Sequence, residues 1–279
     1  MKTRTISRLI TGSNQVDGAG VKLVRVFGYY DTKDLDPFLM LDAFDSKNPE
    51  DYIKGFPWHP HRGIETVTYL ISGDIEHQDS LGNKGSILDG SCQWMTAGEG
   101  IPHQEMPQAS EEMLGLQLWI NLPKKDKMVK PQYRDITSDM VPKIDEEGAI
   151  IKVISGEYKG HKGATEGDYV KATFMDVELE AGKEWSIDTP VDNTVFIYIF
   201  RGEGEFEENF EKKVAMKNGI LFSKGEEFCI RAGQDGIRFA FICGEPLNEP
   251  IAWGGPIVMN TQEELKQAFR ELDEGTFIK

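Results

Sequence analysis

The sequence is poor in cysteine, in histidine and in positive charge. It has 3 Cys and 5 His among 279 residues, and 31 Lys and Arg face 47 Asp and Glu, which gives a net charge of −16. An acidic surface repels phosphate backbones, which argues against nucleic acid as a direct partner. No run of about 18 apolar residues occurs, so we expect no transmembrane helix. The basic start is not followed by the apolar stretch that a signal peptide needs.

The cysteines also indicate a compartment. Cys92, Cys229 and Cys243 are odd in number and far apart, and no Cys-x-x-Cys occurs. Disulfide frameworks use even numbers of cysteines in oxidising compartments, so we expect three reduced thiols and a cytoplasmic protein.

What the sequence does contain is a series of short strands separated by turns. Residues 65–71 and 194–200 are rich in β-branched and aromatic side chains, and each run ends at a glycine-containing turn. The 29 glycines are scattered along the chain, and further turn signals follow at short intervals. Short strands closed by turns at this spacing are typical of sandwiches and barrels, so the fold class predicted is all-β.

One segment departs from this pattern. Thr261 and Glu264 have the spacing of a capping box, in which each side chain satisfies a backbone N–H of the other. Apolar residues then recur at helical spacing, and Gly275 stands where a C-terminal cap belongs. We therefore expect a short C-terminal helix at about 261–274.

Residue types repeat at a separation of 129 positions. The pairs that share this separation are Gly73 and Gly202, Tyr69 and Tyr198, and Gly90 and Gly219. A period of this length indicates a domain duplication and not a solenoid. We expect two similar β-domains, 1–135 and 136–279, joined near residues 131–142.

Four residues of the first half have the spacing of metal ligands. His59 and His61 are two apart, and so are His103 and Glu105, and residues two apart on a strand point to the same face. Two such pairs facing each other would place three nitrogens and one oxygen around one divalent ion. Fe(II), Mn(II), Ni(II), Cu(II) and Zn(II) all accept this ligand set.

The second half has none of these ligands. At the 129-residue separation, His59, His61, His103 and Glu105 map to Asp188, Pro190, Ala232 and Gln234. Only the first domain is therefore predicted to bind metal. Of the other histidines, His77 is expected to be exposed between two turns, and His161 is expected to be a loop residue without a catalytic role.

Large apolar side chains flank the predicted ligands in sequence. We expect them to form the wall of a pocket for a flat ligand. They are Phe56, Trp58, Trp94, Met95 and Met106.

Longer segments carry a resemblance to a known family. The segments are 37–42, 55–69, 93–98, 100–106, 115–123, 244–247 and 255–260. They resemble the pirin family of the cupin superfamily over nearly the whole chain. The resemblance implies a bicupin, with two β-barrel or jelly-roll domains and one metal, usually iron, in the first. It also implies Glu105 as the carboxylate ligand, with Glu65 as a neighbour that orients a ligand imidazole or as the alternative ligand.

The same resemblance implies an activity. Pirins resemble quercetin 2,3-dioxygenases, so we expect a metal-dependent dioxygenase that opens a flavonol ring with O2 and releases CO, with Glu105 as the catalytic acceptor of the hydroxyl proton. The alternative is an iron-binding, redox-responsive regulatory protein that acts through protein partners. Because two fused domains already supply the pairing that single cupins obtain by dimerising, we expect a monomer.

Overall fold

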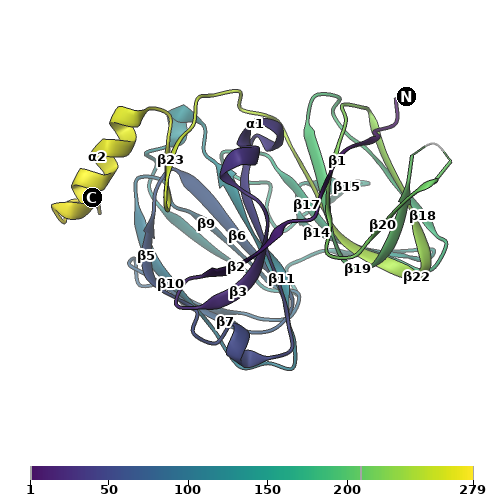
Figure 1. Cartoon of the computed structure of the whole chain (residues 1–279), viewed down its shortest axis with the longest axis horizontal. Helices are drawn as coiled ribbons and strands as arrows, with labels where there is room; N and C mark the ends of the chain where they lie inside the picture. The colour runs from purple at the N-terminus through teal and green to yellow at the C-terminus, as the bar shows by residue number, and fades with distance from the viewer. Residues whose placement is uncertain (1, 208, 279) are drawn as a thin grey trace. The chain divides into compact units, whose positions relative to one another are not determined.

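A computed structural model describes residues 2–207 and 209–278, and these form two compact units (Figure 1). The N-terminal unit comprises residues 13–32, 37–138 and 247–278. The C-terminal unit comprises residues 2–12, 33–36 and 139–246. Within the described residues, no helix is long and apolar enough to cross a membrane.

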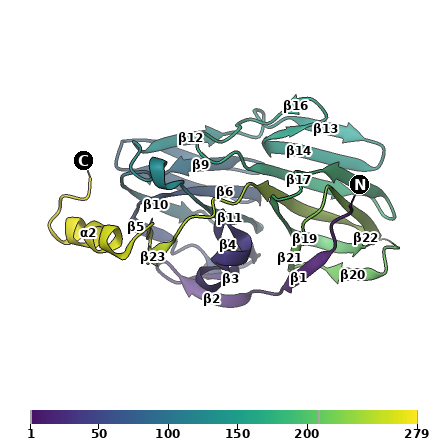
Figure 2. The ribbon, with the colours of Figure 1, turned by 90° about the horizontal axis from the view of Figure 1, so that it is seen from above.

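The N-terminal unit contains two antiparallel sheets. The larger sheet has the strand order β12-β9-β6-β11-β4-β3-β2 (Figure 2). The smaller sheet has the order β5-β10-β7-β8. The larger sheet consists of β2 (Ser13–Asp17), β3 (Val21–Phe27), β4 (Phe38–Ser46), β6 (Ile64–Ser72), β9 (Cys92–Thr96), β11 (Met113–Asn121) and β12 (Gln132–Ile136). The smaller sheet consists of β5 (Phe56–His61), β7 (Ile75–Asp79), β8 (Lys84–Ile87) and β10 (Ile101–Pro107).

The C-terminal segment of the chain adds a hairpin and a helix to this unit. They are β23 (Ala252–Gly254), β24 (Ile257–Met259) and α2 (Gln262–Asp273). The Thr261 hydroxyl accepts from the N–H of Glu264, and the Glu264 carboxylate accepts from the N–H of Thr261, which is the predicted capping box. Leu265 and Ala268 are the buried residues of the helix. The remaining elements outside the sheets are short helical turns. They are η1 (Tyr29–Asp31), α1 (Thr32–Leu35), η2 (Pro49–Asp51) and η3 (Lys124–Asp126).

The C-terminal unit is built on one large antiparallel sheet with the order β1-β21-β19-β22-β17-β14-β13, to which β18 and β20 are added. Its strands are β1 (Ile6–Ile10), β13 (Lys143–Glu146), β14 (Ala149–Ser155), β17 (Thr173–Leu179), β18 (Glu184–Asp188), β19 (Thr194–Phe206), β20 (Lys212–Ala215), β21 (Gly219–Phe222) and β22 (Glu227–Gly244). A separate small ribbon is formed by β15 (Glu157–Tyr158) and β16 (His161–Lys162).

The two large sheets have the same order of strands. Position by position, β12-β9-β6-β11-β4-β3-β2 corresponds to β1-β21-β19-β22-β17-β14-β13. Tyr69 on β6 and Tyr198 on β19 occupy equivalent strands, so the 129-residue separation reflects a structural repeat. The all-β fold with two cupin-like domains and a short C-terminal helix is therefore confirmed, with open sheets and not closed barrels: two facing sheets in the N-terminal unit and one large sheet in the C-terminal unit.

The two units differ from the predicted ranges 1–135 and 136–279 in their terminal segments: the first residues of the chain belong to the C-terminal unit, and the last belong to the N-terminal unit. The division at residues 138 and 139 is close to the expected boundary. However, β1 pairs with β21 and belongs to the C-terminal unit, whereas residues 247–278 belong to the N-terminal unit. The reason is pairing: β1 fills the edge position that β12 fills in the other sheet.

The interiors of the two units differ in polarity. The core of the C-terminal unit is apolar and contains a cluster of aromatic rings around Trp185, Phe228, Phe239 and Phe241. The N-terminal unit instead buries many polar side chains, among them Thr68, Gln93, His103, Glu105 and Gln117. Buried polar groups are costly unless they are paired or bind something, so the N-terminal unit is where a functional site is expected.

Candidate metal centre

The predicted ligands meet where β5 pairs with β10. In the antiparallel register, His103 lies directly opposite His59, and Ile101 lies opposite His61. His61 follows His59 by two positions, so both imidazoles project from the same face of β5. A register shift between His103 and Glu105 brings Phe56 opposite Glu105.

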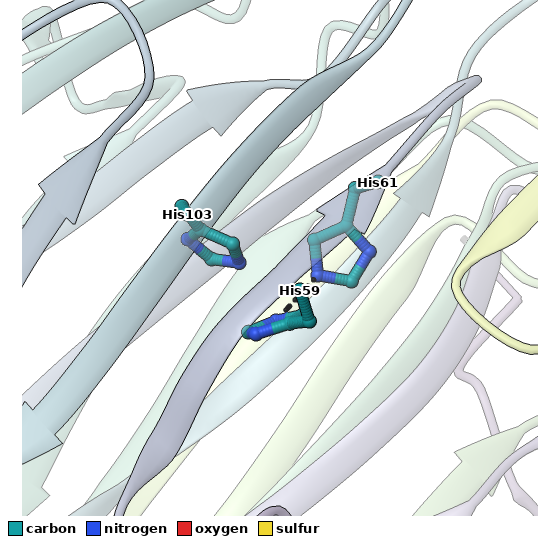
Figure 3. Close-up of side chains that lie close together, drawn as sticks. All are labelled: His59, His61 and His103. Atoms are coloured by element: carbon teal, nitrogen blue, oxygen red, sulfur yellow. Dashed lines mark hydrogen bonds between the residues drawn. The ribbon is translucent and has the colours of Figure 1, made fainter. Parts of the chain in front are cut away.

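The three imidazoles converge (Figure 3). Each of His59, His61 and His103 offers a ring nitrogen, and these nitrogens all lie within 4.8 Å of one another. Ring centroids are 4.8 Å apart for His59 and His61, 4.4 Å for His59 and His103, and 5.0 Å for His61 and His103. The structure thus brings together the three histidines that the sequence singled out.

Backbone carbonyls fix the orientation of two of these rings. Nδ1 of His59 lies 2.9 Å from the carbonyl oxygen of Pro57, and Nδ1 of His61 lies 3.2 Å from that of Pro256. A carbonyl oxygen can only accept, so each Nδ1 carries the proton that it donates. In the neutral rings both Nε2 atoms are then left with a lone pair.

These two bare nitrogens face each other at 3.1 Å between Nε2 of His59 and Nε2 of His61. Two nitrogens bound to one ion at about 2.0–2.1 Å and at angles of about 90–109° lie about 2.8–3.4 Å apart. His103 is fully buried, and neither of its ring nitrogens has a hydrogen-bond partner. The residues present therefore fit a divalent metal ion that takes three imidazole ligands.

Burial keeps the inner rings in the form that binds metal. Desolvation lowers the pKa of His61 to about 3, and the neighbouring His59 adds to this effect. Desolvation also lowers the pKa of His103 well below its ordinary value, helped by His61, His59 and His77. Neutral imidazole is the ligand form, so these two rings are ready to coordinate without first losing a proton.

Glu105 is buried beside this cluster, but its carboxylate is not a member of the three-histidine group. It accepts hydrogen bonds from the Thr68 hydroxyl at 3.1 Å and from the Gln117 amide at 2.9 Å. Thr68 and Gln117 project from β6 and β11 of the larger sheet, so the carboxylate of β10 is fixed from the opposite sheet.

Glu65, the alternative carboxylate, lies elsewhere. On β6, Thr66 and Thr68 share one face of the sheet, and it is from this face that Thr68 reaches Glu105. Glu65 is the residue directly before Thr66. Strand alternation thus directs Glu65 to the other face of the sheet. There its carboxylate accepts from the Thr96 hydroxyl at 2.7 Å.

His77 corrects an expectation. It was expected to be exposed, but its side chain is buried, because β7 lies between β8 and β10. The ring stacks on Tyr133 with 4.7 Å between centroids and lies 5.4 Å from the ring of His103. Burial lowers its pKa, and neither ring nitrogen has a hydrogen-bond partner. The available signal was the spacing, because His77 stands two positions after the apolar Ile75 and so shares its face of the strand.

The five expected wall residues separate into different environments. Met95 lies opposite Thr66 in the inner apolar cluster, and the Phe56 ring lies 6.5 Å from that of His59. Trp58 is 49% exposed. Trp94 lies opposite Val67 on the outer face of β9.

Met106 alternates with Glu105 on β10 and therefore projects away from the imidazoles. The ring of Trp119 also contacts the cluster, because it packs edge-on against His61 with 4.9 Å between centroids. Sequence reasoning missed Trp119, Thr68 and Gln117. Gln117 could have been noticed, because it is a polar residue in the middle of the otherwise apolar run 116–120.

Comparison with known proteins identifies the family. Residues 20–120 match the model of the family described as Pirin, and residues 174–278 match that of the Pirin C-terminal cupin domain. The chain belongs to the pirin family. The resemblance in sequence motifs is thereby confirmed, and both halves of the duplication carry a family match.

Relatives span the whole chain. It is 41% identical over 278 residues to a Pseudomonas aeruginosa protein named "Putative quercetin 2,3-dioxygenase", covering 98% of this chain and 97% of the relative. It is 38% identical over 282 residues to human pirin, covering 98% and 94%.

Solved structures show the same fold. A structure titled quercetin 2,3-dioxygenase from Acinetobacter baumannii has a TM-score of 0.88 at 32% identity and covers 99% of this chain and 98% of its own. A bacterial pirin from Escherichia coli in complex with nickel(II) has a TM-score of 0.66 at 20% identity and covers 86% and 98%. At that identity, the second likeness concerns the fold alone.

Proposed function

We propose that this pirin is a metal-dependent dioxygenase that opens the ring of a flavonol such as quercetin. One observation carries the proposal: the two Nε2 atoms of His59 and His61 face each other at 3.1 Å while their Nδ1 atoms donate to carbonyl oxygens. That arrangement suits a cation between them. Relatives named or titled as quercetin 2,3-dioxygenases support the reaction class.

The reaction adds one O2 to the flavonol and yields a depside and CO. A bound divalent ion would serve as a Lewis acid that favours the anion of the 3-hydroxyl, the form that reacts with O2. His59, His61 and His103 would hold that ion. We propose Fe(II), and Mn(II), Ni(II), Cu(II) and Zn(II) also accept imidazole ligands.

Glu105 is proposed as the group that accepts the proton of the 3-hydroxyl, and as the fourth ligand before it does so. Its carboxylate is fixed by the donors of Gln117 and Thr68, so it is aimed from β10 without free rotation. A base that is held in place loses little entropy when it takes the proton.

Apolar side chains beside the imidazoles would orient the flat rings of the substrate. Met95 is fully buried in the cluster that contains Trp119, and the ring of Phe56 lies 6.5 Å from that of His59. His59 itself is only half buried, which marks it as the ligand nearest to solvent. Substrate would therefore approach past His59.

The test is release of CO from quercetin under air by protein loaded with Fe(II). We expect release from the wild type and none from His103→Ala. His161→Ala is the matched control, because His161 is exposed on β16 of the C-terminal unit, and it should release CO at the wild-type rate.

Two results would contradict the proposal. One is equal CO release from His103→Ala and wild type. The other is no release from wild-type protein that demonstrably contains iron, which would favour the regulatory alternative or a substrate that is not a flavonol.

A further inference from the structure

The C-terminal strap, residues 247–278, reaches the metal centre of the N-terminal unit. Figure 2 shows β23 and α2 at the end of this unit where β5 lies. The turn between β23 and β24 presents the carbonyl oxygen of Pro256 to Nδ1 of His61, at 3.2 Å. The strap thus supplies a direct partner to a candidate ligand that precedes it by 195 residues.

We propose that this strap is a positioning element of the metal centre. The Pro256 carbonyl holds His61 in the tautomer whose proton is on Nδ1 and directs the bare Nε2 toward His59. The proposal rests on the metal site of the proposed function. Partners of this kind fix the tautomer and the ring orientation of metal-binding histidines.

Backbone pairing fixes the position of Pro256 relative to His61. Ile257 and Arg62, the residues that follow these two, form a parallel bridge, and the N–H of Val258 donates to the carbonyl of Arg62 at 3.0 Å. Lys127 closes the same junction, because its Nζ donates to the carbonyls of Gly63 at 2.7 Å and Val258 at 2.9 Å. The carbonyl is therefore set by contacts immediately beside it.

Arg62 ties the end of the strap to the residue next to His61. Its guanidinium donates to the Glu271 carboxylate at 2.8 Å and to the carbonyl of Phe277 at 2.8 Å. It also lies over the Phe277 ring, 4.0 Å from the centroid. The side chain is 2% exposed, so these contacts are made away from water, where they are strongest.

Gly63 allows the strap to approach this closely. Its φ is +76°, and a Cβ at this position would lie 2.0 Å from the Val258 carbonyl oxygen. Any side chain would push β24 away from Arg62. Gly82 has a φ of +91° but no atom within 4 Å of an added Cβ, which makes it a matched control for backbone strain alone.

Rings support the second side of His61. Trp119 packs edge-on against it, and Trp253 of the strap packs on Trp119 with 5.8 Å between centroids. The strap therefore holds the imidazole directly at its Nδ1, and it supports the ring through Trp253, which packs on Trp119.

The first measurement is the tautomer of His61 in metal-free protein, from long-range ¹⁵N–¹H correlations of its ring nitrogens. We expect the proton on Nδ1 in wild type and in Gly82→Ala. In Gly63→Ala we expect that preference to be lost. A proton on Nε2 in the wild type would overturn the proposal.

The second measurement is affinity for Co(II) and Zn(II), by competition with a chelator. We expect Gly63→Ala to bind about 10–100-fold more weakly than wild type, and Gly82→Ala to bind equally well. A folded Gly63→Ala with wild-type tautomer and affinity would refute the proposal, as would a wild type that binds neither metal. If Gly63→Ala does not fold, Phe277→Ala replaces it, because it removes the ring on which Arg62 packs. We expect this variant to lose metal affinity as well, but less than Gly63→Ala. Unchanged affinity in Phe277→Ala would contradict a positioning role of the strap.

Neither measurement uses a flavonol or O2. Failure of the proposed activity would appear as absent CO release from protein that binds metal and keeps the Nδ1 proton. Failure of the positioning role would appear in the tautomer and affinity while CO release persists.

Discussion

The side-chain amide of Gln117 donates to both carboxylate oxygens of Glu105, with Nε2···O distances of 2.9 Å each. Gln117 stands on β11 and Glu105 on β10, so one hydrogen-bonded pair joins the two facing sheets. The same amide also lies 3.0 Å from the Thr68 hydroxyl, which itself donates to Glu105. A buried carboxylate in the interior is thus matched by a small set of neutral donors.

Gln117→Leu removes these amide hydrogen bonds and leaves Glu105 with the Thr68 hydroxyl. Because a buried acceptor that loses its donor keeps its desolvation cost, we expect the free energy of unfolding to fall by about 1–3 kcal/mol. CO release should fall as well, since the carboxylate is no longer aimed. Urea unfolding and the CO assay measure the two effects.

Gln104→Leu is the control for that change. Gln104 alternates with Glu105 on β10, is partly buried and bonds only weakly, at 3.3 Å, to Gln78. We expect a change within about 0.5 kcal/mol. Equal stability of Gln117→Leu and Gln104→Leu would show that the Gln117 amide does not support Glu105.

Glu105→Gln and Glu65→Gln separate the two candidate carboxylates. We expect metal content to fall in Glu105→Gln, because an amide is a weaker ligand than a carboxylate, and to stay at the wild-type level in Glu65→Gln, whose side chain bonds Thr96 on the other face of β6. Metal per protein, measured after dialysis by mass spectrometry, decides between them. Full retention in Glu105→Gln would reverse the assignment.

His77→Phe tests the buried ring beside His103. Neither buried nitrogen of His77 has a hydrogen-bond partner, and the carboxylate of Asp79 lies 4.0 Å from Nε2, whereas the stacking on Tyr133 needs only an aromatic face. Phenylalanine keeps the stacking and removes two unsatisfied polar atoms, so we expect the free energy of unfolding to rise by about 1 kcal/mol. His161→Phe, at an exposed position, should change it by less than about 0.5 kcal/mol. A clear loss of stability in His77→Phe would instead mean that the imidazole is hydrogen-bonded in solution.

Lys127 gives a prediction about pH. Burial lowers its pKa from 10.5 to about 7, although the Asn121 side chain and the Gly63 and Val258 carbonyls surround its Nζ. Between pH 7 and 10.5 the unfolded chain then holds a proton on this residue that the folded chain has lost. Stability from this group therefore rises with pH across that window and is constant below it.

The measurement is the titration of Lys127 Cε by ¹³C NMR, with unfolding followed from pH 6 to 10. We expect a midpoint near 7, and an increase in stability with pH relative to Lys127→Met. A midpoint near 10.5 would show that the three oxygens outweigh the desolvation.

The fold could be predicted from the sequence because its signals are local. Runs of β-branched and aromatic residues that end at glycine turns mark the strands, and Thr261 and Glu264 mark the start of the helix. The segment exchange could not be predicted, because nothing local in β1 tells which sheet edge it will pair with. Edge pairing depends on register between strands more than 200 residues apart, such as Ile6 and Phe222.

The site was predictable in part for the same reason. Two-residue spacing placed His59 with His61, and strand pairing of β5 with β10 then brought His103 to them. The residues that hold Glu105 come from the opposite sheet, and no spacing along the chain reveals contacts across an interior. Trp94 and Met95 were both expected in the pocket wall, but they are adjacent on β9 and therefore project to opposite faces of the sheet.

The strap also sets an order of events during protein synthesis. Residues 247–278 are translated long after His59, His61 and His103, yet they supply the Pro256 carbonyl and the Phe277 contacts of Arg62. A nascent chain that has emerged only as far as residue 138 has all three imidazoles but lacks the partner that orients one of them. The orientation of His61 should therefore be completed only after residues 247–278 have been synthesised and have paired with Arg62.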